Sequence, residues 1–586
     1  MRPWCCVVVI AIGACGGSGA PVVATSPLPT GSITSNVLRA DYAGSSACAD
    51  CHADLYKTWA ASPMRNMTRD ATIPEIGAQI RAPFAGAVLH VGDDTCTMTM
   101  DGATRVITVR SPKGDHTFHV TKVIGGRYRE DFVGVEAGDP TERVLPATYV
   151  FATRTWRYKG YSVMVKERPR MSWQGVWSQE CIGCHNTLPA ATMLYDELYG
   201  PALPPYQGKL ADRILPANKR WPASTRDPSG LDKALDAEIA FLGAPPVEGG
   251  VGVKLPAAAS AMEHKLDGAH LVELGIGCEA CHNGSRAHAQ DPTVKPSFEQ
   301  LTPLFAVSPP RGETGTRAQW INHTCAKCHT VLFSHYPFTW EGGLRTKNPG
   351  GSSISSGEGR DYQLGGCASQ MACTTCHDPH TVDPPAKLAA LATHAGDHLC
   401  TSCHPAFASA EAAAKHSHHQ SVGCISCHMA KKNMGLDYVL NRYHRIGSPT
   451  DPRRVEKDRP LECALCHADK SVDALVTTME RWYGKHYDRE ALKQLYGDDL
   501  SVNTMRATLA MGKPHEQAVA IATFGEARER GAIAAIVPAL AHEYPLVRYF
   551  AQRALQRITG DPVAIDVGAP AAQVRAAAAA WLANQH

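Results

Sequence analysis

The stretch MACTTCHDPH, residues 371–380, contains two cysteines separated by two residues and then, directly, a histidine. The same C-x-x-C-H pattern occurs eight times in the 586-residue chain, and these motifs account for 16 of its 21 cysteines. We number them motifs 1 to 8 in chain order: Cys48–Cys51–His52, Cys181–Cys184–His185, Cys278–Cys281–His282, Cys325–Cys328–His329, Cys373–Cys376–His377, Cys400–Cys403–His404, Cys424–Cys427–His428 and Cys463–Cys466–His467.

The histidine at the end of each motif separates the alternative chemistries. Zinc ribbons and disulfide oxidoreductases also use C-x-x-C pairs, but neither requires histidine as the next residue. Covalent attachment of haem c does require it, because two thioether bonds fix the porphyrin and the adjacent imidazole becomes the proximal iron ligand. The repeat therefore predicts eight covalent haem c groups, with zinc or disulfide sites as the weaker alternatives.

The composition agrees with a cofactor-rich core. Aromatic residues make up only 7% of the chain, and porphyrins would supply the missing apolar volume. The formal charge of +2 moves toward negative once haem propionates are added. No concentrated basic block occurs, so a nucleic-acid partner is not expected.

The N-terminus resembles an export signal. An arginine precedes an apolar run from Cys5 to Ala14, which is too short to span a bilayer as a helix. The sequence Ile12-Gly13-Ala14-Cys15 resembles a bacterial lipobox, in which Cys15 would be lipidated; the alternative is an ordinary signal peptide with a chance cysteine. We therefore expect a signal peptide over 1–14 and a flexible linker over 15–40. An exported protein, periplasmic or tethered to the outer membrane as a lipoprotein, follows from this interpretation.

Strand signals lie between motifs 1 and 2. Residues 95–100 alternate with period two, Asp101-Gly102 is a hairpin turn signal, and residues 105–109 continue the pattern. This predicts a small antiparallel β insert over roughly 85–170, within a first multihaem segment over 41–200. Residues 200–260 are rich in Pro, Ala and Gly and favour an extended connection. A second multihaem segment over 201–470 would carry six motifs on short helices and loops.

The character of the sequence changes after motif 8. Residues 533–540 and 545–555 read as two amphipathic helices, Gly560 sits where a C-cap is expected, and 573–582 reads as a third helix. PLVRYFAQRALQRITG resembles a HEAT repeat, with a generic helical bundle as the alternative. The expected fold is mainly α, with little regular sheet, a small β insert, and a helical, HEAT-like domain over 471–586.

Distal iron ligands are the next question, because a second His or Met saturates a haem and an empty position can bind substrate. The chain has 27 histidines, so 19 remain after the eight proximal ones, and the supply does not force an open site. The candidate distal ligands are Met64, His288, His380, His394, His419 and His444, with His398, His416 and His418 in similar contexts. A buried free thiol is expected at Cys96; Cys367 could pair with it, which the sequence does not decide.

Several stretches together resemble a known family. YAGSSACADCHADLYKTWAASPM, GIGCEACHNGSRAH, CTTCHDPH, HHQSVGCISCHM and HRIGSP, in this order, are similar to exported bacterial octahaem c-type cytochromes of the cytochrome c-552/4-like multihaem group. The resemblance covers about residues 42–470 and implies electron transfer through stacked haems in a mainly helical fold. The resemblance implies no particular substrate, and Asn283 departs from the usual family sequence around His288.

Three functions are compatible with these features. The first is an electron carrier that passes electrons through eight haems between exported redox proteins. The second is a reductase or oxidase of a small nitrogen or sulfur oxyanion at one five-coordinate haem, although no C-x-x-C-K motif occurs and no catalytic residue can be assigned. The third is a scaffold whose C-terminal repeats dock a redox partner, while a lipid anchor binds the membrane.

Overall fold

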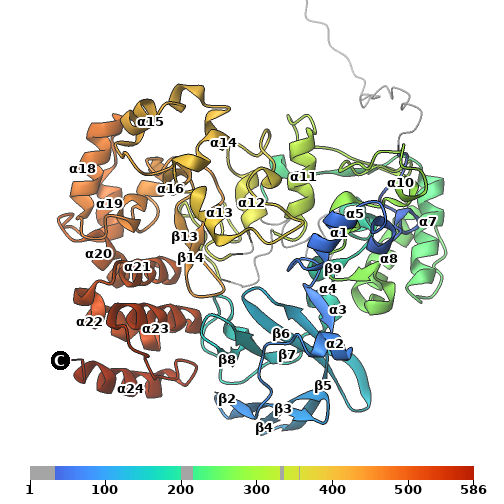
Figure 1. The fold of residues 1–586 in the computed structure, drawn as a ribbon, viewed down its shortest axis with the longest axis horizontal. Helices are drawn as coiled ribbons and strands as arrows, with labels where there is room; N and C mark the ends of the chain where they lie inside the picture. The colour runs from blue at the N-terminus through green and yellow to red at the C-terminus, as the bar shows by residue number, and fades with distance from the viewer. Residues whose placement is uncertain (1–32, 200–214, 330–335, 356, 586) are drawn as a thin grey trace, which may run out of the picture.

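The computed structural model describes residues 33–199, 215–329, 336–355 and 357–585. Figure 1 shows three regions: a sheet at the lower end, short helices and loops that carry the motifs above it, and a stack of C-terminal helices at the left. The signal peptide, most of the linker and Cys15 lie outside the described residues. No helix in the described part of the chain is long and apolar enough to cross a membrane.

The sheet is the largest departure from the sequence-based expectation. It has eight antiparallel strands in the order β2 to β8, with β1 paired to β5, and it is nearly closed into a barrel. The expectations of a mainly α fold, of a small β insert and of little regular sheet were therefore wrong. The strands are β1 (Thr68–Asp70), β2 (Ala87–Val91), β3 (Asp94–Asp101), β4 (Thr104–Ser111), β5 (Gly114–Gly125), β6 (Arg129–Glu136), β7 (Asp139–Val150) and β8 (Thr155–Tyr158).

The predicted strands at 95–100 and 105–109 are confirmed as parts of β3 and β4, joined at Gly102 with a φ of 56°. The strands that the sequence did not reveal are β6 to β8, which continue the same meander by short turns. Inward side chains from most strands, among them Met98, Phe118 and Phe132, form one hydrophobic core inside the curled sheet. Because the sheet encloses a hydrophobic core of its own, it is a structural unit in its own right and not a small insertion in a helical fold.

Helices in the motif-bearing region are short, as expected. They are α1 (Ala53–Ala60), α2 (Pro74–Gly77), α3 (Trp177–Glu180), α4 (Ile182–His185), α5 (Ala190–Tyr199), α9 (Cys278–His282), α10 (Arg286–Gln290), α11 (Arg317–Ala326), α12 (Glu358–Gln363), α13 (Pro385–Ala390), α14 (His398–Thr401), α15 (Ala410–Ser417), α16 (Cys424–His428) and α17 (Pro452–Val455). Three two-stranded ribbons tie loops together: β9 (Asn186–Thr187) with β11 (Glu273–Leu274), β10 (Ala223–Thr225) with β12 (Phe305–Val307), and β13 (Lys431–Met434) with β14 (Leu440–Arg442).

The segment 200–260 is not an extended connection in its described part. It contains two longer helices, α7 (Pro228–Phe241) and α8 (Val251–Lys265), which pack together and against α3 and α5, near motif 2. Asp227 caps α7 by accepting a hydrogen bond from the backbone N–H of Gly230, and Pro228 occupies the first helical position. These are ordinary helix-start signals, which the high proline and glycine content of the segment concealed.

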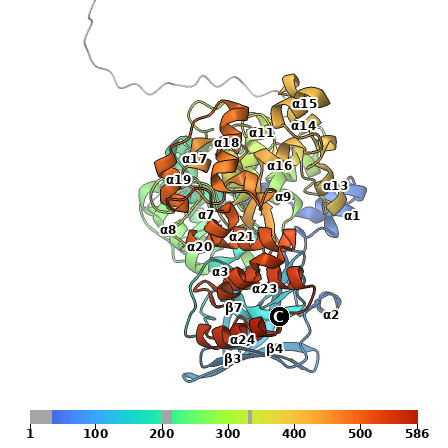
Figure 2. The same cartoon turned by 90° about the vertical axis from the view of Figure 1, so that its left-hand side faces the viewer.

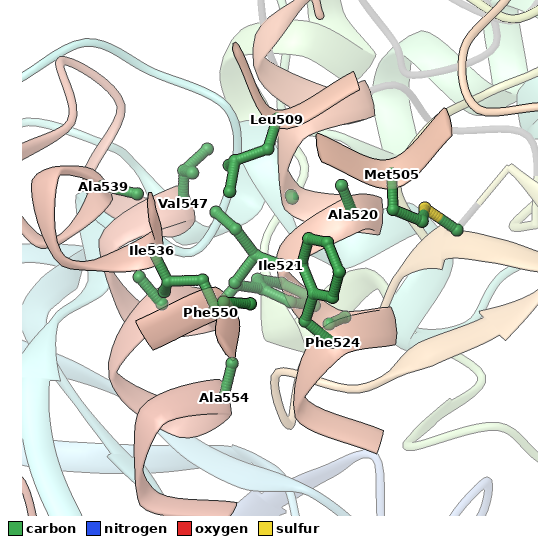
Figure 3. Packing of buried hydrophobic residues seen from close by; sticks show 14 of the residues in the cluster. Met505, Leu509, Ala520, Ile521, Phe524, Ile536, Ala539, Val547, Phe550 and Ala554 are labelled. Atoms are coloured by element: carbon green, nitrogen blue, oxygen red, sulfur yellow. The ribbon is translucent and has the colours of Figure 1, made fainter. Parts of the chain in front are cut away.

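The C-terminal domain is helical, as predicted. Its helices are α18 (Val472–Tyr483), α19 (Arg489–Tyr496), α20 (Thr504–Met511), α21 (Pro514–Ala527), α22 (Ile533–Ile536), α23 (Pro545–Thr559) and α24 (Ala571–Ala583). Gly560 ends α23 in the left-handed conformation, which confirms the expected C-cap. Figure 3 shows Ile521, Phe524 and Phe550 among the side chains that fill the space between these helices.

The C-terminal helices also contact the sheet. In Figure 2, α23 and α24 lie in front of the sheet, and Lys166, from the segment after β8, pairs with Glu543 at 2.8 Å. Arg548, fully buried on α23, pairs with Glu167 of the same segment. The sheet and the tail are therefore one packed assembly that supports the motif region from below and from the side.

Candidate haem-binding sites

Each motif is built as a single helical turn. In motif 1 the backbone N–H of His52 donates to the carbonyl of Cys48 at 2.9 Å, and motifs 2, 4, 5, 6 and 8 show the same bond at 3.0–3.2 Å. Motifs 3 and 7 form α9 and α16. Such a turn brings the two cysteines and the histidine to the same side of a short helix, as double thioether attachment with axial ligation requires. None of the described cysteines forms a disulfide.

Five motif histidines face a second imidazole ring. The pairs, with their centroid separations, are His52–His288 at 6.2 Å, His282–His380 at 6.2 Å, His377–His444 at 6.4 Å, His428–His416 at 6.2 Å and His467–His419 at 5.9 Å. A metal–imidazole bond is about 2 Å long, so two rings on opposite sides of one iron have centroids roughly 6 Å apart. The spacing of all five pairs fits an iron ion between the rings.

Hydrogen bonds fix the orientation of several of these rings. The Nδ1–H of His288 donates to the carbonyl of Val294 at 2.8 Å, and that of His444 donates to Arg442 at 3.0 Å. His419 and His428 make the same kind of bond to Ser417 and Gly447. Because a carbonyl oxygen only accepts, each ring carries its proton on Nδ1, which leaves Nε2 available as a metal ligand.

The other predicted distal ligands lie elsewhere. His394 uses both ring nitrogens in hydrogen bonds, Nδ1 with Asp397 at 2.7 Å and Nε2 with the carbonyl of Gln420 at 2.9 Å. Met64 lines the cavity beside motif 1, but the ring that faces His52 is His288. Of the cluster at 416–419, His418 stacks on Trp482 with centroids 4.2 Å apart. The sequence alone could not tell which of these three neighbouring histidines face a motif.

Motifs 2, 4 and 6 differ from the rest. In the described part of the chain, no second imidazole lies at such a distance from His185, His329 or His404. Burial lowers the pKa of His185 to about 4, and its Nδ1 is buried without a hydrogen-bond partner. The carboxylate of Glu358, 3.7 Å from His329, raises the pKa of that histidine to about 9.

A single large cavity connects motifs 1 to 5. Its volume is 2090 Å³, and its lining includes the proximal histidines of all five motifs together with His288, His380 and His444. Sites for one small molecule are at most about 1,000 Å³. Residues of β6, β7 and the turn after β8 form one wall, so the large sheet that the sequence did not predict encloses part of the cavity.

The motif sulfurs give the spatial order of the motifs. The thiols of Cys48 and Cys278 are hydrogen-bonded, which places motif 1 against motif 3, and Cys281 senses the charges of both cysteines of motif 4. Cys184 and Cys328 of motifs 2 and 4, Cys325 and Cys373 of 4 and 5, and Cys400 and Cys424 of 6 and 7 are also close enough to hydrogen-bond. Cys376 and Cys400 of motifs 5 and 6, and Cys427 and Cys466 of motifs 7 and 8, are neighbours that affect each other electrostatically. Hydrogen-bonding and electrostatic neighbours together give the series 1–3–4–5–6–7–8, with motif 2 next to motif 4.

The donor atoms of the described residues form no zinc site. No group of three or more His, Cys, Asp or Glu side chains in the described residues is arranged to hold a metal ion directly. The histidine pairs instead leave room for a planar group between the rings. The residues present therefore fit haem c, with the motif cysteines and histidines as its attachment points.

Comparisons with known proteins bear on the repeated motif. A family model described as a doubled CXXCH motif matches residues 366–409, which contain motifs 5 and 6. No curated protein matches the chain. One similar solved structure is the crystal structure of the outer cell wall cytochrome OcwA, with 15% identity, a TM-score of 0.37, and coverage of 88% of this chain and 100% of that one. The repeated motif and the family match support a multihaem c-type cytochrome that binds haem c covalently and carries electrons.

Proposed function

We propose that the protein binds eight haem c groups, one at each motif, and carries electrons along the series 1–3–4–5–6–7–8. The observation that carries the proposal is that the cysteines of successive motifs in this series are hydrogen-bonding or electrostatic neighbours. The haem irons supply reversible one-electron chemistry when bound. The chain fixes each group through two thioethers and holds five of them between two imidazole rings.

The paired histidines support transfer and not catalysis at five of the positions. Two nitrogen ligands saturate an iron, so it keeps the same ligands in both oxidation states. The hydrogen bonds from Nδ1 to backbone carbonyls hold the distal rings in place. In this assignment His288, His380, His444, His416 and His419 are distal ligands, and Met64 and His394 are not.

Intact-mass analysis of the native exported protein, combined with a pyridine haemochrome assay, tests the count. We expect the mass of eight haems and a matching absorbance. A mass increment of fewer groups would refute the count, and a colourless assay would refute the whole assignment. Electron paramagnetic resonance should then show low-spin ferric signals from at least five bis-histidine centres.

A second candidate function is reduction or oxidation of a small nitrogen or sulfur oxyanion at an open haem. The specific observation in its favour is that His185, His329 and His404 face no second ring in the described residues. Adding carbon monoxide to the reduced protein distinguishes the two functions, because only a haem with an open position shifts its Soret band. A spectrum without any response would eliminate the enzyme.

We propose that the protein is exported and lipidated at Cys15. We also propose that the C-terminal helices, which we assign as HEAT-like, bind redox proteins. The lipobox-like sequence supports the first two points, and the stacked helices α20 to α24 support the third. A Cys15→Ala variant should be exported yet released from membranes. Membrane retention of that variant would contradict lipidation at Cys15.

A further inference from the structure

The segment 416–419 at the end of α15 carries two of the five assigned distal ligands. His416, in the last turn of α15, faces His428 of motif 7 with ring centroids 6.2 Å apart. His419 faces His467 of motif 8 at 5.9 Å. Between them, His418 ends α15 in the left-handed conformation, with a φ of 57°. One short segment therefore serves two motifs, and its conformation decides whether both rings are in position to bind iron.

A tryptophan of the C-terminal helices holds the left-handed residue. The ring of His418 stacks on that of Trp482, with centroids 4.2 Å apart and an interplanar angle of 18°. Trp482 also meets His419 edge-on, with a centroid separation of 6.3 Å. A residue other than glycine is uncommon in the left-handed conformation, so the stacked rings stabilise a turn that the backbone alone disfavours.

The neighbouring Tyr483 holds the same segment from a second side. Its hydroxyl donates to the carbonyl of Ser417 at 3.3 Å. The same carbonyl accepts the Nδ1–H of His419 at 2.6 Å, and this bond leaves Nε2 of the ring available for iron. The Tyr483 ring also meets that of His416 edge-on, with centroids 6.4 Å apart. Tyr483 therefore contacts both halves of the segment.

Both aromatic residues stand at the end of α18, which begins shortly after His467 of motif 8. Ser471 caps the start of this helix with a side-chain hydrogen bond, and Gly484 ends it in the left-handed conformation. Its 12 residues form a rod about 18 Å long. Val476 and Met479 anchor the rod in the core of the C-terminal helices. The helix thus joins the proximal side of motif 8 to the segment that carries its distal ring.

On the basis of the proposed distal ligands, we propose that Trp482 and Tyr483 are positioning residues for two haems at once. They hold the segment 416–419 in the conformation that places one distal ring at motif 7 and another at motif 8. Neither residue binds iron itself. The C-terminal helices thereby set the ligation of the last two haems of the series together.

Competition by carbon monoxide tests this proposal on the complete, haem-loaded protein. Carbon monoxide binds a reduced iron only after the distal ring has left it, so a less tightly held segment lowers the concentration needed for half-saturation. In Trp482→Ala we expect that concentration to fall about three- to tenfold at the haems of motifs 7 and 8, which corresponds to the usual strength of a ring–ring contact. Trp482→Phe should restore most of the wild-type value, because a phenyl ring can still stack on His418.

A second variant removes the same contact from the other side. His418→Asn keeps a residue that tolerates the left-handed conformation but deletes the ring, and it should reproduce the effect of Trp482→Ala with α18 unaltered. Trp581→Ala is the matched control, because this tryptophan packs against the same core from α24, at the other end of the molecule from α15 (Figure 1, Figure 2). A shift of equal size in the control would mean general loosening of the fold and would overturn the proposal.

His416→Ala and His419→Ala identify the signals of the two haems, because each variant removes one distal ring. An unchanged half-saturation in Trp482→Ala and His418→Asn would overturn the proposal, and so would a change at one of the two haems alone. If the two ligand variants themselves leave the response unchanged, the assignment of distal ligands fails and the proposal fails with it. The intact mass of each variant, which should retain eight haems, separates these outcomes from a failure of haem attachment.

Discussion

Imidazole rings from distant parts of the chain carry the local chemistry of the site. His52 and His288 are 236 positions apart in sequence, yet their rings lie 6.2 Å apart. The proton on Nδ1 of His288 is fixed by a nearby backbone carbonyl, that of Val294, whereas the tertiary structure brings the ring to His52. The proximal ligands are a prediction that the motif alone makes, because attachment chemistry is encoded in adjacent residues. The choice of distal partners could not, because it depends on which loops the fold brings together.

Replacing a distal ring should open one iron. In a His288→Ala variant we expect the haem of motif 1 to lose its sixth ligand and to bind carbon monoxide when reduced, with no loss of haem by mass. Difference spectra of the reduced protein measure this directly. His264→Ala is the control, because that side chain is 60% exposed and hydrogen-bonds only to its own helix. An unchanged carbon monoxide response in the His288 variant would show that this ring is not a ligand.

At the scale of elements, the hidden parts of the fold have identifiable causes. The hairpin at Gly102 was recognisable because both strands alternate cleanly and a turn dipeptide joins them. Strands β6 and β7 carry charged residues and glycine in their sequence, and their register shifts at two points, so no period-two pattern appears. Helix α7 was concealed by the prolines and glycines around it. Elements that depend on neighbours for burial are poorly visible in sequence alone.

His542, in the connection before α23, should make the free energy of unfolding depend on pH. Burial lowers the pKa of His542 to about 4. Its Nδ1 accepts a hydrogen bond from the backbone N–H of Tyr544 at 3.0 Å, and its Nε2–H donates to Gln517 at 2.9 Å, so the neutral ring is required. The unfolded histidine has a pKa near 6.5 and binds its proton first. Stability is therefore complete above about pH 6.5 and is lost as the pH falls toward 4.

The size of this loss is at most about 3 kcal/mol for His542, from about 1.4 kcal/mol per pKa unit. Chemical denaturation followed by circular dichroism between pH 7 and 4 measures it. A His542→Asn variant should be less stable at pH 7 and should show a shallower pH dependence. If the two proteins lose stability in parallel on acidification, another group is responsible.

Close packing between α21 and α23 depends on Gly525. A Cβ added there would lie 2.8 Å from the Cα of Ala554, a backbone atom that cannot move alone. Gly525→Ala should therefore destabilise the domain by about 1–3 kcal/mol, as overpacking does. Gly252 in α8 has open space around its added Cβ, so Gly252→Ala should be neutral or stabilising by up to about 1 kcal/mol. Thermal unfolding of both variants tests the contrast.

At the scale of the whole molecule, the three regions pack against one another through shared core residues. The hydrophobic core of the C-terminal helices includes Val150 of the sheet, Met434 of β13 and Ala464 inside motif 8. The hydroxyl of Tyr336 and Nδ1 of the buried His515 are hydrogen-bonded at 2.6 Å. The sequence suggested a separate tail behind a cytochrome, because composition changes at residue 471. The packing instead makes the helices part of the scaffold that holds motif 8.

Deleting residues 471–586 should therefore do more than remove a docking surface. The deletion would expose side chains such as Tyr438, Val455 and Leu461, each of which contributes about 1.5–3 kcal/mol when buried. Together with the other core residues they approach the whole stability of a domain, about 5–15 kcal/mol. We expect low yield, a lowered melting temperature and loss of haem from motif 8, measured by intact mass.

A milder deletion of residues 571–586 removes α24 and the buried Val574 and Ala578, and it should retain all haems. A fully haem-loaded, equally stable product of the larger deletion would instead mean that the helices serve only to bind a partner.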